Sequence, residues 1–152
     1  MRAVIQRVSA SSVVSDGIPT GKTNAGLVVL LGVKRGDDES DAVRLAEKIG
    51  KLRIFSDENG KMNKSAIDIG GSALVISNFT LYANYAHGNR PDYFDSEEPS
   101  RANELYETFS KKLAEFLPVS TGVFGADMKI DMCADGPVTI VMDSETLKKE
   151  RK

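Results

Sequence analysis

Three side chains in the middle of the chain could together carry out nucleophilic catalysis. Ser77 and Thr80 have hydroxyl groups, and His87, the only histidine, follows Thr80 by seven residues. A hydroxyl becomes an effective nucleophile when a base such as histidine takes its proton, as in acyl-transfer triads. Because His87 falls in a polar loop, an esterase that uses Ser77 and His87 stays open, but a solvent-exposed histidine without a role is the preferred interpretation.

Residues 17–23 read Gly-Ile-Pro-Thr-Gly-Lys-Thr and are similar to part of a phosphate-binding loop. That loop needs four residues between its first glycine and its Gly-Lys pair. Only three residues separate Gly17 from Gly21. A strand pattern follows, so no helix N-terminus is available to hold a phosphate. We therefore expect this segment to be one arm of a β-hairpin.

The chain offers no convincing set of metal ligands. Its single cysteine, Cys133, is far in sequence from His87. The acidic turn at residues 57–60 lacks the glycine and the closing glutamate of a calcium loop. The remaining carboxylates show no ligand spacing. We expect no metal and no cofactor, and an activity that needs neither.

The composition is that of an ordinary globular domain. The chain has 152 residues, of which 41% are hydrophobic and 28% charged, and this predicts a single domain over residues 1–152. The net charge of −2 argues against binding nucleic acid through bulk electrostatics. A few well-placed lysines or arginines would still be enough to hold the end of an RNA.

Several features favour a soluble cytoplasmic protein without membrane contact. The single thiol fits a reducing compartment, and neither a leader pattern nor a long apolar span is present in the sequence. Residues 145–152 are expected to form a flexible tail. They include a basic cluster that is interpreted as solvated, formed by Lys148, Lys149, Arg151 and Lys152.

The pattern of apolar residues predicts an α+β fold. Two amphipathic helices are expected, one starting at Asp37 and Asp38 and the other running from Pro99 to before Pro118. The aromatic stripe on the second helix is interpreted as core. The two helices should pack on a mostly antiparallel, barrel-like sheet. Its strands are expected at residues 2–15, 26–33, 73–83, 122–133 and 138–143, with a hairpin turn at Asp16-Gly17.

Two short segments resemble motifs of the D-aminoacyl-tRNA deacylase family, also called D-tyrosyl-tRNA deacylases. Residues 77–81 read SNFTL and are similar to the family's SQFTL, with Asn78 in place of glutamine. Residues 134–139 read ADGPVT and are similar to the family's NxGPVT, with Ala134 in place of asparagine. Further segments resemble the family in the same order along the chain: MRAVIQRV, AGLVVLLGV, KLRIFSDENGKMN, GNRP and FGADMKI.

The resemblance implies a D-tyrosyl-tRNA deacylase-like fold and a homodimer that hydrolyses the ester of D-aminoacyl-tRNA as a step of translation quality control. It implies that main-chain N–H groups of Phe79 and Thr80 hold the ester carbonyl, beside Ser77 and Asn78. The terminal ribose hydroxyl of the tRNA would activate the attacking water. A nucleophilic Thr80 side chain ranks second, because no base is evident beside it.

The second motif is implied to act in the partner's site. Gly136 and Pro137 are joined by a cis peptide in the family, and their carbonyl oxygens would exclude an L side chain while Val138 and Thr139 contribute to substrate binding. Such a filter ignores side-chain identity, so glycine mischarged on the tRNA for alanine should also be removed. The alternative is a non-catalytic module that binds nucleic acid or protein on the same fold.

Overall fold

The computed structural model describes residues 1–148, and β1 (Arg2–Ser15) is the central strand of its main sheet. One edge of β1 pairs along its length with β8 (Met128–Asp143). The other edge is shared by β3 (Gly26–Gly32) and β2 (Ile18–Thr23), and all three pairings are antiparallel.

The sheet continues from β3 with two parallel strands. These are β6 (Ser72–Ser77), which pairs with β3, and the short β7 (Val119–Thr121), which pairs with β6. The sheet is therefore mixed, with three antiparallel and two parallel pairings. A separate hairpin consists of β4 (Phe55–Ser56) and β5 (Met62–Lys64).

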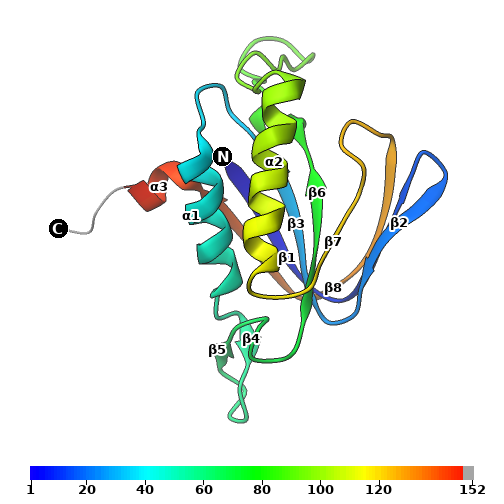
Figure 1. Ribbon diagram of the computed structural model, residues 1–152, viewed down its shortest axis with the longest axis vertical. Helices are drawn as coiled ribbons and strands as arrows, with labels where there is room; N and C mark the ends of the chain where they lie inside the picture. The colour runs from blue at the N-terminus through cyan, green and yellow to red at the C-terminus, as the bar shows by residue number, and fades with distance from the viewer. Residues whose placement is uncertain (149–152) are drawn as a thin grey trace.

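The sheet bends until β2 and β7 approach each other, which nearly closes a barrel. Ser120 Oγ donates a hydrogen bond to the main-chain oxygen of Lys22 at 3.1 Å. A Cβ on Gly21 would lie 2.8 Å from the main-chain oxygen of Thr121, so only glycine permits this approach. In Figure 1, β2 and the first half of β8 curve away from the helices. The predicted barrel-like β core is confirmed.

Helices α1 (Glu39–Gly50) and α2 (Pro99–Ala114) cover one face of the sheet (Figure 1). Asp38 caps α1 through a reciprocal pair of hydrogen bonds with Asp41, and Pro99 occupies the first turn of α2. Both predicted helices are confirmed. Their buried side chains, among them Leu45, Ile49, Leu105, Phe109 and Leu113, pack against β1, β3 and β6 in the larger of two apolar clusters.

The second apolar cluster lies on the other side of the bent sheet. Its buried members are Val8, Val13, Val28, Leu74 and Ile76, with Leu30, Met128 and Ile130 packed against them. Together the two clusters give each face of β3 and β6 its own core, which explains the continuous apolar run of residues 26–33.

Three expectations about the elements need correction. The predicted strand over residues 73–83 ends at Ser77, and residues 79–82 form the short 3₁₀ helix η1 (Phe79–Tyr82). The two predicted strands on either side of residues 134–137 are one strand, β8. A third helix, α3 (Ser144–Lys148), replaces the first part of the expected flexible tail. The rest of that tail, residues 149–152, lies outside the described residues.

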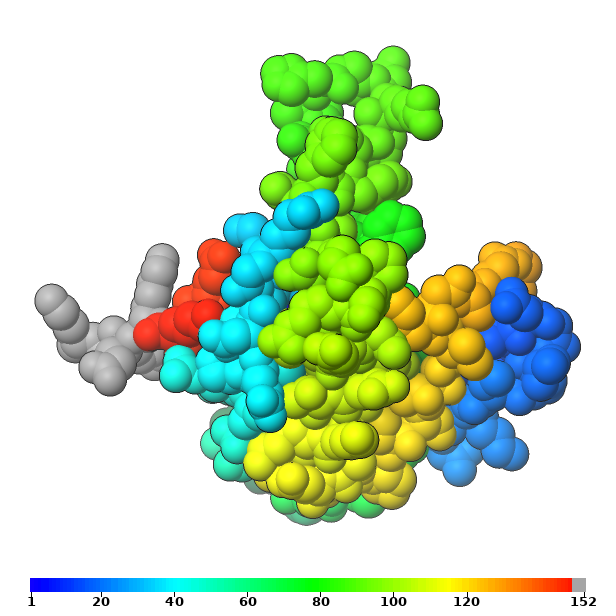
Figure 2. Space-filling model, turned by 45° about the horizontal axis from the view of Figure 1, so that its top comes forward, coloured from blue at the N-terminus to red at the C-terminus, as the bar shows by residue number. Residues whose placement is uncertain are grey.

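The loop between η1 and α2 projects from the body of the molecule, as the space-filling view shows (Figure 2). Its two arms are joined by an isolated bridge between Asn84 and Asp92, with hydrogen bonds of 2.8 and 2.9 Å. His87 lies on the exposed part of this loop.

Candidate active site

Two main-chain donors are left open where β6 ends and η1 begins. The Asn78 amide forms the last hydrogen bond between this segment and β3, donating to the Leu31 oxygen at 2.8 Å. The first N–H groups of a helix have no partner inside it. Within residues 1–148, the amides of Phe79 and Thr80 donate to no protein acceptor, whereas Leu81 donates to the Asn78 oxygen at 3.4 Å.

Gly32 makes this arrangement possible. A Cβ on Gly32 would lie 3.0 Å from Cβ of Leu81 and 3.1 Å from the main-chain oxygen of Asn78. The missing side chain lets η1 pack directly on the end of β3. Since β3 also ends at Gly32, residues beyond Ser77 have no strand to pair with on that side. The chain therefore turns, and the amides of Phe79 and Thr80 stay free.

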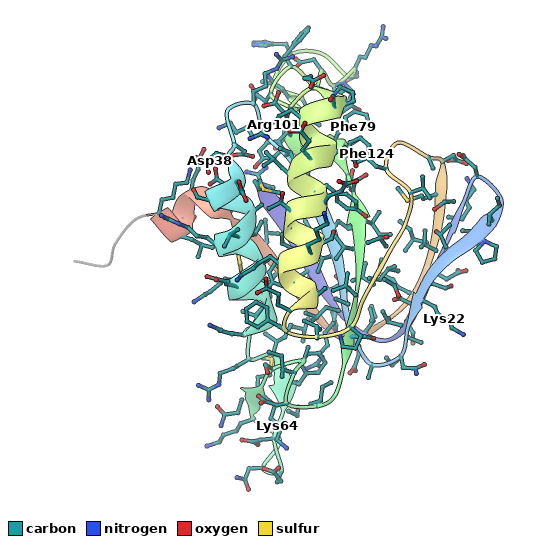
Figure 3. The ribbon with its side chains drawn as sticks, viewed as in Figure 1. Lys22, Asp38, Lys64, Phe79, Arg101 and Phe124 are labelled. Carbon is teal, nitrogen blue, oxygen red and sulfur yellow. The ribbon has the colours of Figure 1, made fainter. Side chains whose placement is uncertain are left out.

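A pocket of about 560 Å³ opens beside η1. Ser77, Asn78 and Phe79 contribute to its wall. Figure 3 shows Phe79 and Phe124 near the N-terminal half of α2, on the side that faces away from α1. The other lining residues come from the end of β3, the loop before α2, α2 itself and the segment between β7 and β8; they include Arg35, Tyr93, Ser96, Ala102, Tyr106, Phe124 and Met128.

Aromatic and hydroxyl groups fix the wall of the pocket. The Phe79 ring, 59% exposed, meets Tyr93 edge to face with centroids 5.0 Å apart, and Ser96 Oγ donates to the Phe79 oxygen at 2.9 Å. The Tyr106 hydroxyl donates to the Val75 oxygen at 3.0 Å. Burial raises the pKa of Tyr106 to about 12, so this hydroxyl remains protonated at neutral pH and cannot act as a base.

Among residues 1–148, neither candidate nucleophile forms a hydrogen bond with a side-chain base. The Thr80 hydroxyl donates to the side-chain oxygen of Asn78, an amide oxygen that cannot accept a proton at neutral pH. In the part of the chain that the structure describes, His87 makes no hydrogen bond or ion pair with Ser77 or Thr80. The geometry therefore does not support the pairing of Ser77 with His87.

The second motif lies away from this pocket. Gln6 pairs with Thr139 and Val8 pairs with Ala134, so one residue of β1 faces the four residues 135–138 of β8. These four residues form a wide bulge. The Gly136-Pro137 peptide in it is cis. None of residues 134–139 lines the pocket, so a single chain does not bring the two motifs together.

Arg7 and Gln6 hold the bulge. Arg7 Nε donates to the Asp135 oxygen at 3.1 Å, and the Thr139 hydroxyl donates to Gln6 Oε1 at 2.7 Å. Gly136 and Pro137 themselves are exposed, and Val138 is half-buried against the larger apolar cluster.

Sequence reasoning missed Arg7 and the outer wall of the pocket. The sequence did contain a signal for Arg7. Ala3 and Ile5 alternate on the buried face of β1, and the next residue in this alternation is the charged Arg7, while Val8 is buried instead. Tyr106 was assigned to the core, and its ring also lines the pocket. Ser96 and Tyr93 come from a polar loop, in which the family-like GNRP segment at residues 88–91 was the only signal in the sequence.

Residues 1–148 contain neither a cluster of metal-ligating side chains nor a membrane-spanning helix. No group of three or more His, Cys, Asp or Glu side chains in that range could hold a metal ion. Among the same residues, no helix is long and apolar enough to cross a membrane.

The fold is shared with two solved structures. One, described as a c-Myc DNA unwinding element binding protein, has a TM-score of 0.88 and 35% identity, and the match covers 94% of this chain and 98% of that one. The other is described as a probable eukaryotic D-amino acid tRNA deacylase. It has a TM-score of 0.78 with 13% identity over 93% of this chain and 98% of the other, and this likeness concerns the fold alone.

The similarity in sequence is more specific than the similarity in fold. The model of the family described as D-Tyr-tRNA(Tyr) deacylase matches residues 4–143, and the chain belongs to this family. A D-aminoacyl-tRNA deacylase of Persephonella marina is 54% identical over 147 residues, which are 97% of this chain and 100% of the relative. One of Ruegeria pomeroyi is 54% identical over 144 residues, 94% of this chain and 99% of the relative.

Proposed function

We propose that this chain hydrolyses the ester bond between a D-amino acid and the 3′ end of tRNA, releasing both, and that it does so as a homodimer in the cytoplasm. Membership of the D-Tyr-tRNA(Tyr) deacylase family supports this activity. So do the relatives named D-aminoacyl-tRNA deacylase, which match nearly the whole chain. The observation that carries the chemistry is the pair of free main-chain amides at Phe79 and Thr80. They border a pocket whose two carboxylates, Glu97 and Glu98, accept hydrogen bonds from the main-chain amides of Gly36 and Arg101.

In the proposed reaction, the two amides hold the ester carbonyl oxygen while it gains negative charge. A preorganised donor at such a position contributes about 3 kcal/mol to transition-state stabilisation. Water forms a bond to the carbonyl carbon while the free terminal ribose hydroxyl accepts its proton and passes its own proton to the ester oxygen. The bond from that carbon to the ester oxygen then breaks. Ser77 and Asn78 shape the wall on which these donors sit.

Selection of the D configuration is assigned to the partner subunit. Gly136 and Pro137 are exposed on a bulge held by Arg7 and lie outside the pocket of their own chain, which is compatible with their acting in another subunit. There, main-chain oxygens facing the substrate α-carbon would clash with an L side chain, and Val138 and Thr139 would support the same surface. An α-hydrogen fits in that position, so glycyl-tRNA formed on the tRNA for alanine should also be a substrate.

The test is deacylation of one tRNA charged with either D- or L-tyrosine. We expect rapid release of the D-amino acid, no release of the L-amino acid above the spontaneous rate, and elution as a dimer in size-exclusion chromatography. Equal rates for both substrates would contradict the chirality filter. No release of either, by a folded protein, would contradict the deacylase function itself.

A second candidate is a non-catalytic protein that binds nucleic acid. It is favoured by the 35% identity to the protein described as a c-Myc DNA unwinding element binding protein. The same assay distinguishes the two functions, because a binding module would retain the charged tRNA without accelerating its hydrolysis.

A further inference from the structure

A second concave surface is lined by residues of α1, of α3 and of the segment that leads to β4. It has a volume of about 460 Å³. Four of its lining residues are basic, namely Arg44, Lys48, Lys51 and Arg53, and we call this surface the basic groove. The whole chain carries a net charge of −2, so the concentration of positive charge here is local.

The basic residues of the groove are aligned by the helix and left without acidic partners. Arg44, Lys48 and Lys51 are spaced by four and three residues, which places them on one face of α1 and its C-terminal end. Like charges at this spacing repel. The single acid of the groove, Glu47, pairs with Lys112 at 3.3 Å. Within residues 1–148, no carboxylate forms an ion pair with the four bases.

Arg53 is held in place by a neutral partner. Its Nε donates to the main-chain oxygen of Asn63 at 2.7 Å, and another of its nitrogens donates to the Asn63 side chain. The hairpin of β4 and β5 thus orients the guanidinium without neutralising its charge. An ordered arginine that forms no ion pair within residues 1–148 is well suited to bind a phosphate.

The basic groove also lies next to the Gly136-Pro137 bulge. Arg7 connects the two, because its Nη1 donates to the Ile54 oxygen at 2.7 Å and its Nε donates to the Asp135 oxygen at 3.1 Å. Ile54 follows Arg53, and Asp135 precedes Gly136. In the proposed dimer the bulge of one subunit enters the partner's pocket. The basic groove of that subunit would then border the same pocket.

We propose that the basic groove of one subunit binds backbone phosphates of the tRNA whose aminoacylated end lies in the partner's pocket. The proposal rests on the proposed function and adds to it the surface that holds the acceptor stem. Lysine and arginine contacts to phosphates release counterions, so the affinity should be independent of sequence and should fall steeply with salt. The free amides act on the ester, and the basic groove acts on the body of the RNA.

The test compares the double variant Lys48→Glu with Lys51→Glu, called the groove variant, with a control. The control changes the net charge of the chain by the same amount at two lysines outside the basic groove. Lys22→Glu with Lys129→Glu is suitable, because both lysines are exposed on strands and neither lines the basic groove. Binding of uncharged tRNA is measured by fluorescence anisotropy at several salt concentrations. Deacylation is measured on D-tyrosyl-tRNA and on D-tyrosyl-adenosine, which lacks the acceptor stem.

We expect the groove variant to raise Kd and KM for tRNA at least about tenfold and to lower the salt slope by about two, with kcat unchanged. Its kcat/KM on D-tyrosyl-adenosine should equal that of the parent, and the control should match the parent in every assay. Parental tRNA affinity and salt slope in the groove variant would overturn the proposal. Loss of activity on D-tyrosyl-adenosine would also overturn it, since the groove would then act through the active site.

Two further measurements keep the result interpretable. If the Glu substitutions prevent folding, the double variant Lys48→Gln with Lys51→Gln is used instead. It removes both positive charges without adding negative ones, and it should raise the tRNA Kd severalfold. If the parent deacylates neither substrate, the proposed function fails, but anisotropy still decides whether the basic groove binds tRNA. Parental binding to phosphatidylglycerol vesicles without binding to tRNA would assign the basic groove to a lipid surface and overturn the proposal.

Discussion

Arg7 donates a hydrogen bond from Nε to the main-chain oxygen of Asp135 at 3.1 Å, one residue before Gly136. The same guanidinium donates to Ile54 at 2.7 Å, and its side chain is only 13% exposed. A residue in the middle of β1 therefore ties the exposed bulge of β8 to the base of the β4–β5 hairpin. Hydrogen bonds from a charged donor in such a sheltered position are among the stronger ones in proteins.

Replacing Arg7 should impair the function of the bulge. The substitution Arg7→Met keeps the length of the side chain but removes both donors. We expect kcat/KM on D-tyrosyl-tRNA to fall about ten- to a hundredfold, because each such hydrogen bond contributes about 1.5–3 kcal/mol. Steady-state deacylation measures the effect. Lys129→Met, at a residue 77% exposed on the same strand as Gly136, serves as the control and should behave as the parent. A folded Arg7→Met protein with parental kcat/KM would show that the bulge needs no such support.

Removing the Thr80 hydroxyl should have little effect. In Thr80→Ala the main-chain amide that is proposed to hold the ester oxygen remains, and the lost hydroxyl only donates to the Asn78 side chain. We expect kcat on D-tyrosyl-tRNA to stay within about threefold of the parent, as the backbone donor is retained. Loss of nearly all turnover in a folded, dimeric Thr80→Ala protein would instead identify Thr80 as the nucleophile.

Removing the Thr80 amide should have a large effect. Thr80→Pro deletes the N–H at the second residue of η1, and proline is tolerated in the first turn of a helix. We expect kcat to fall about 10²- to 10³-fold, the loss typical of one oxyanion donor. Circular dichroism and thermal unfolding check that the fold survives. If Thr80→Pro and Thr80→Ala had the same kcat, the amide would have no role in catalysis.

His87→Ala tests the alternative esterase. His87 is exposed on the projecting loop, and among residues 1–148 it forms no hydrogen bond with either hydroxyl candidate. We expect the variant to keep parental kcat/KM on D-tyrosyl-tRNA and to show the same turnover of p-nitrophenyl acetate as the parent. A selective loss of activity on the small ester would show that Ser77 and His87 work together after all.

The helices could be predicted from the sequence because their signals are local. Asp38 caps α1, and Pro99 lies in the first turn of α2. Each helix also has apolar residues at helical spacing along its own length, so every signal lies within the helix or directly beside it. The pairing of strands is not local. Ser72 lies beside Gly26 in a parallel ladder, and no feature of either segment specifies that partner.

The active site could be predicted only in part, for the same reason. Residues 79–83 have the aromatic and apolar composition of a strand, but tertiary context decides against it, because β3 ends at Gly32 and offers no further edge. The sequence also suggested a turn at residues 134–137 between two strands. The structure keeps one strand, since β1 is a partner on both sides of the bulge. Positions such as Tyr93 and Ser96 depend on how a long loop folds back on η1.

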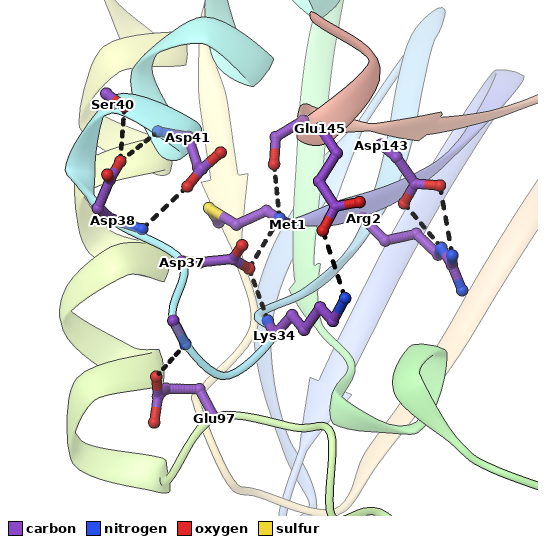
Figure 4. Close-up of polar contacts among 12 residues, drawn as sticks. Met1, Arg2, Lys34, Asp37, Asp38, Ser40, Asp41, Glu97, Asp143 and Glu145 are labelled. Carbon is purple, nitrogen blue, oxygen red and sulfur yellow. Dashed lines mark hydrogen bonds and ion pairs between the residues drawn. The ribbon is translucent and has the colours of Figure 1, made fainter. Parts of the chain in front are cut away.

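Asp41 is buried at the start of α1 and should be a major source of acid sensitivity (Figure 4). Burial by itself raises the pKa of Asp41. Contacts with the Lys148 ammonium, at 2.8 Å, and with the Asp38 amide, at 3.0 Å, outweigh burial, together with smaller effects of Ser144 and the Met1 ammonium. The pKa therefore falls from an ordinary value of 3.8 to about 2. The folded state thus binds this proton less readily than the unfolded state does.

The contribution of Asp41 to stability should accordingly be complete above about pH 4 and should disappear as the pH falls through 2. We expect Asp41→Asn, which can still accept the hydrogen bond from Asp38, to lower the free energy of unfolding by about 2 kcal/mol at pH 7. Urea unfolding at pH 7, 4, 3 and 2 should show the difference from the parent shrinking towards pH 2. Glu39→Gln, at an exposed carboxylate in the same turn, is the matched control and should change stability by only a few tenths of a kcal/mol. A difference between the parent and Asp41→Asn that stayed the same from pH 7 to pH 2 would show that the charge of Asp41 is not what stabilises this end of the helix.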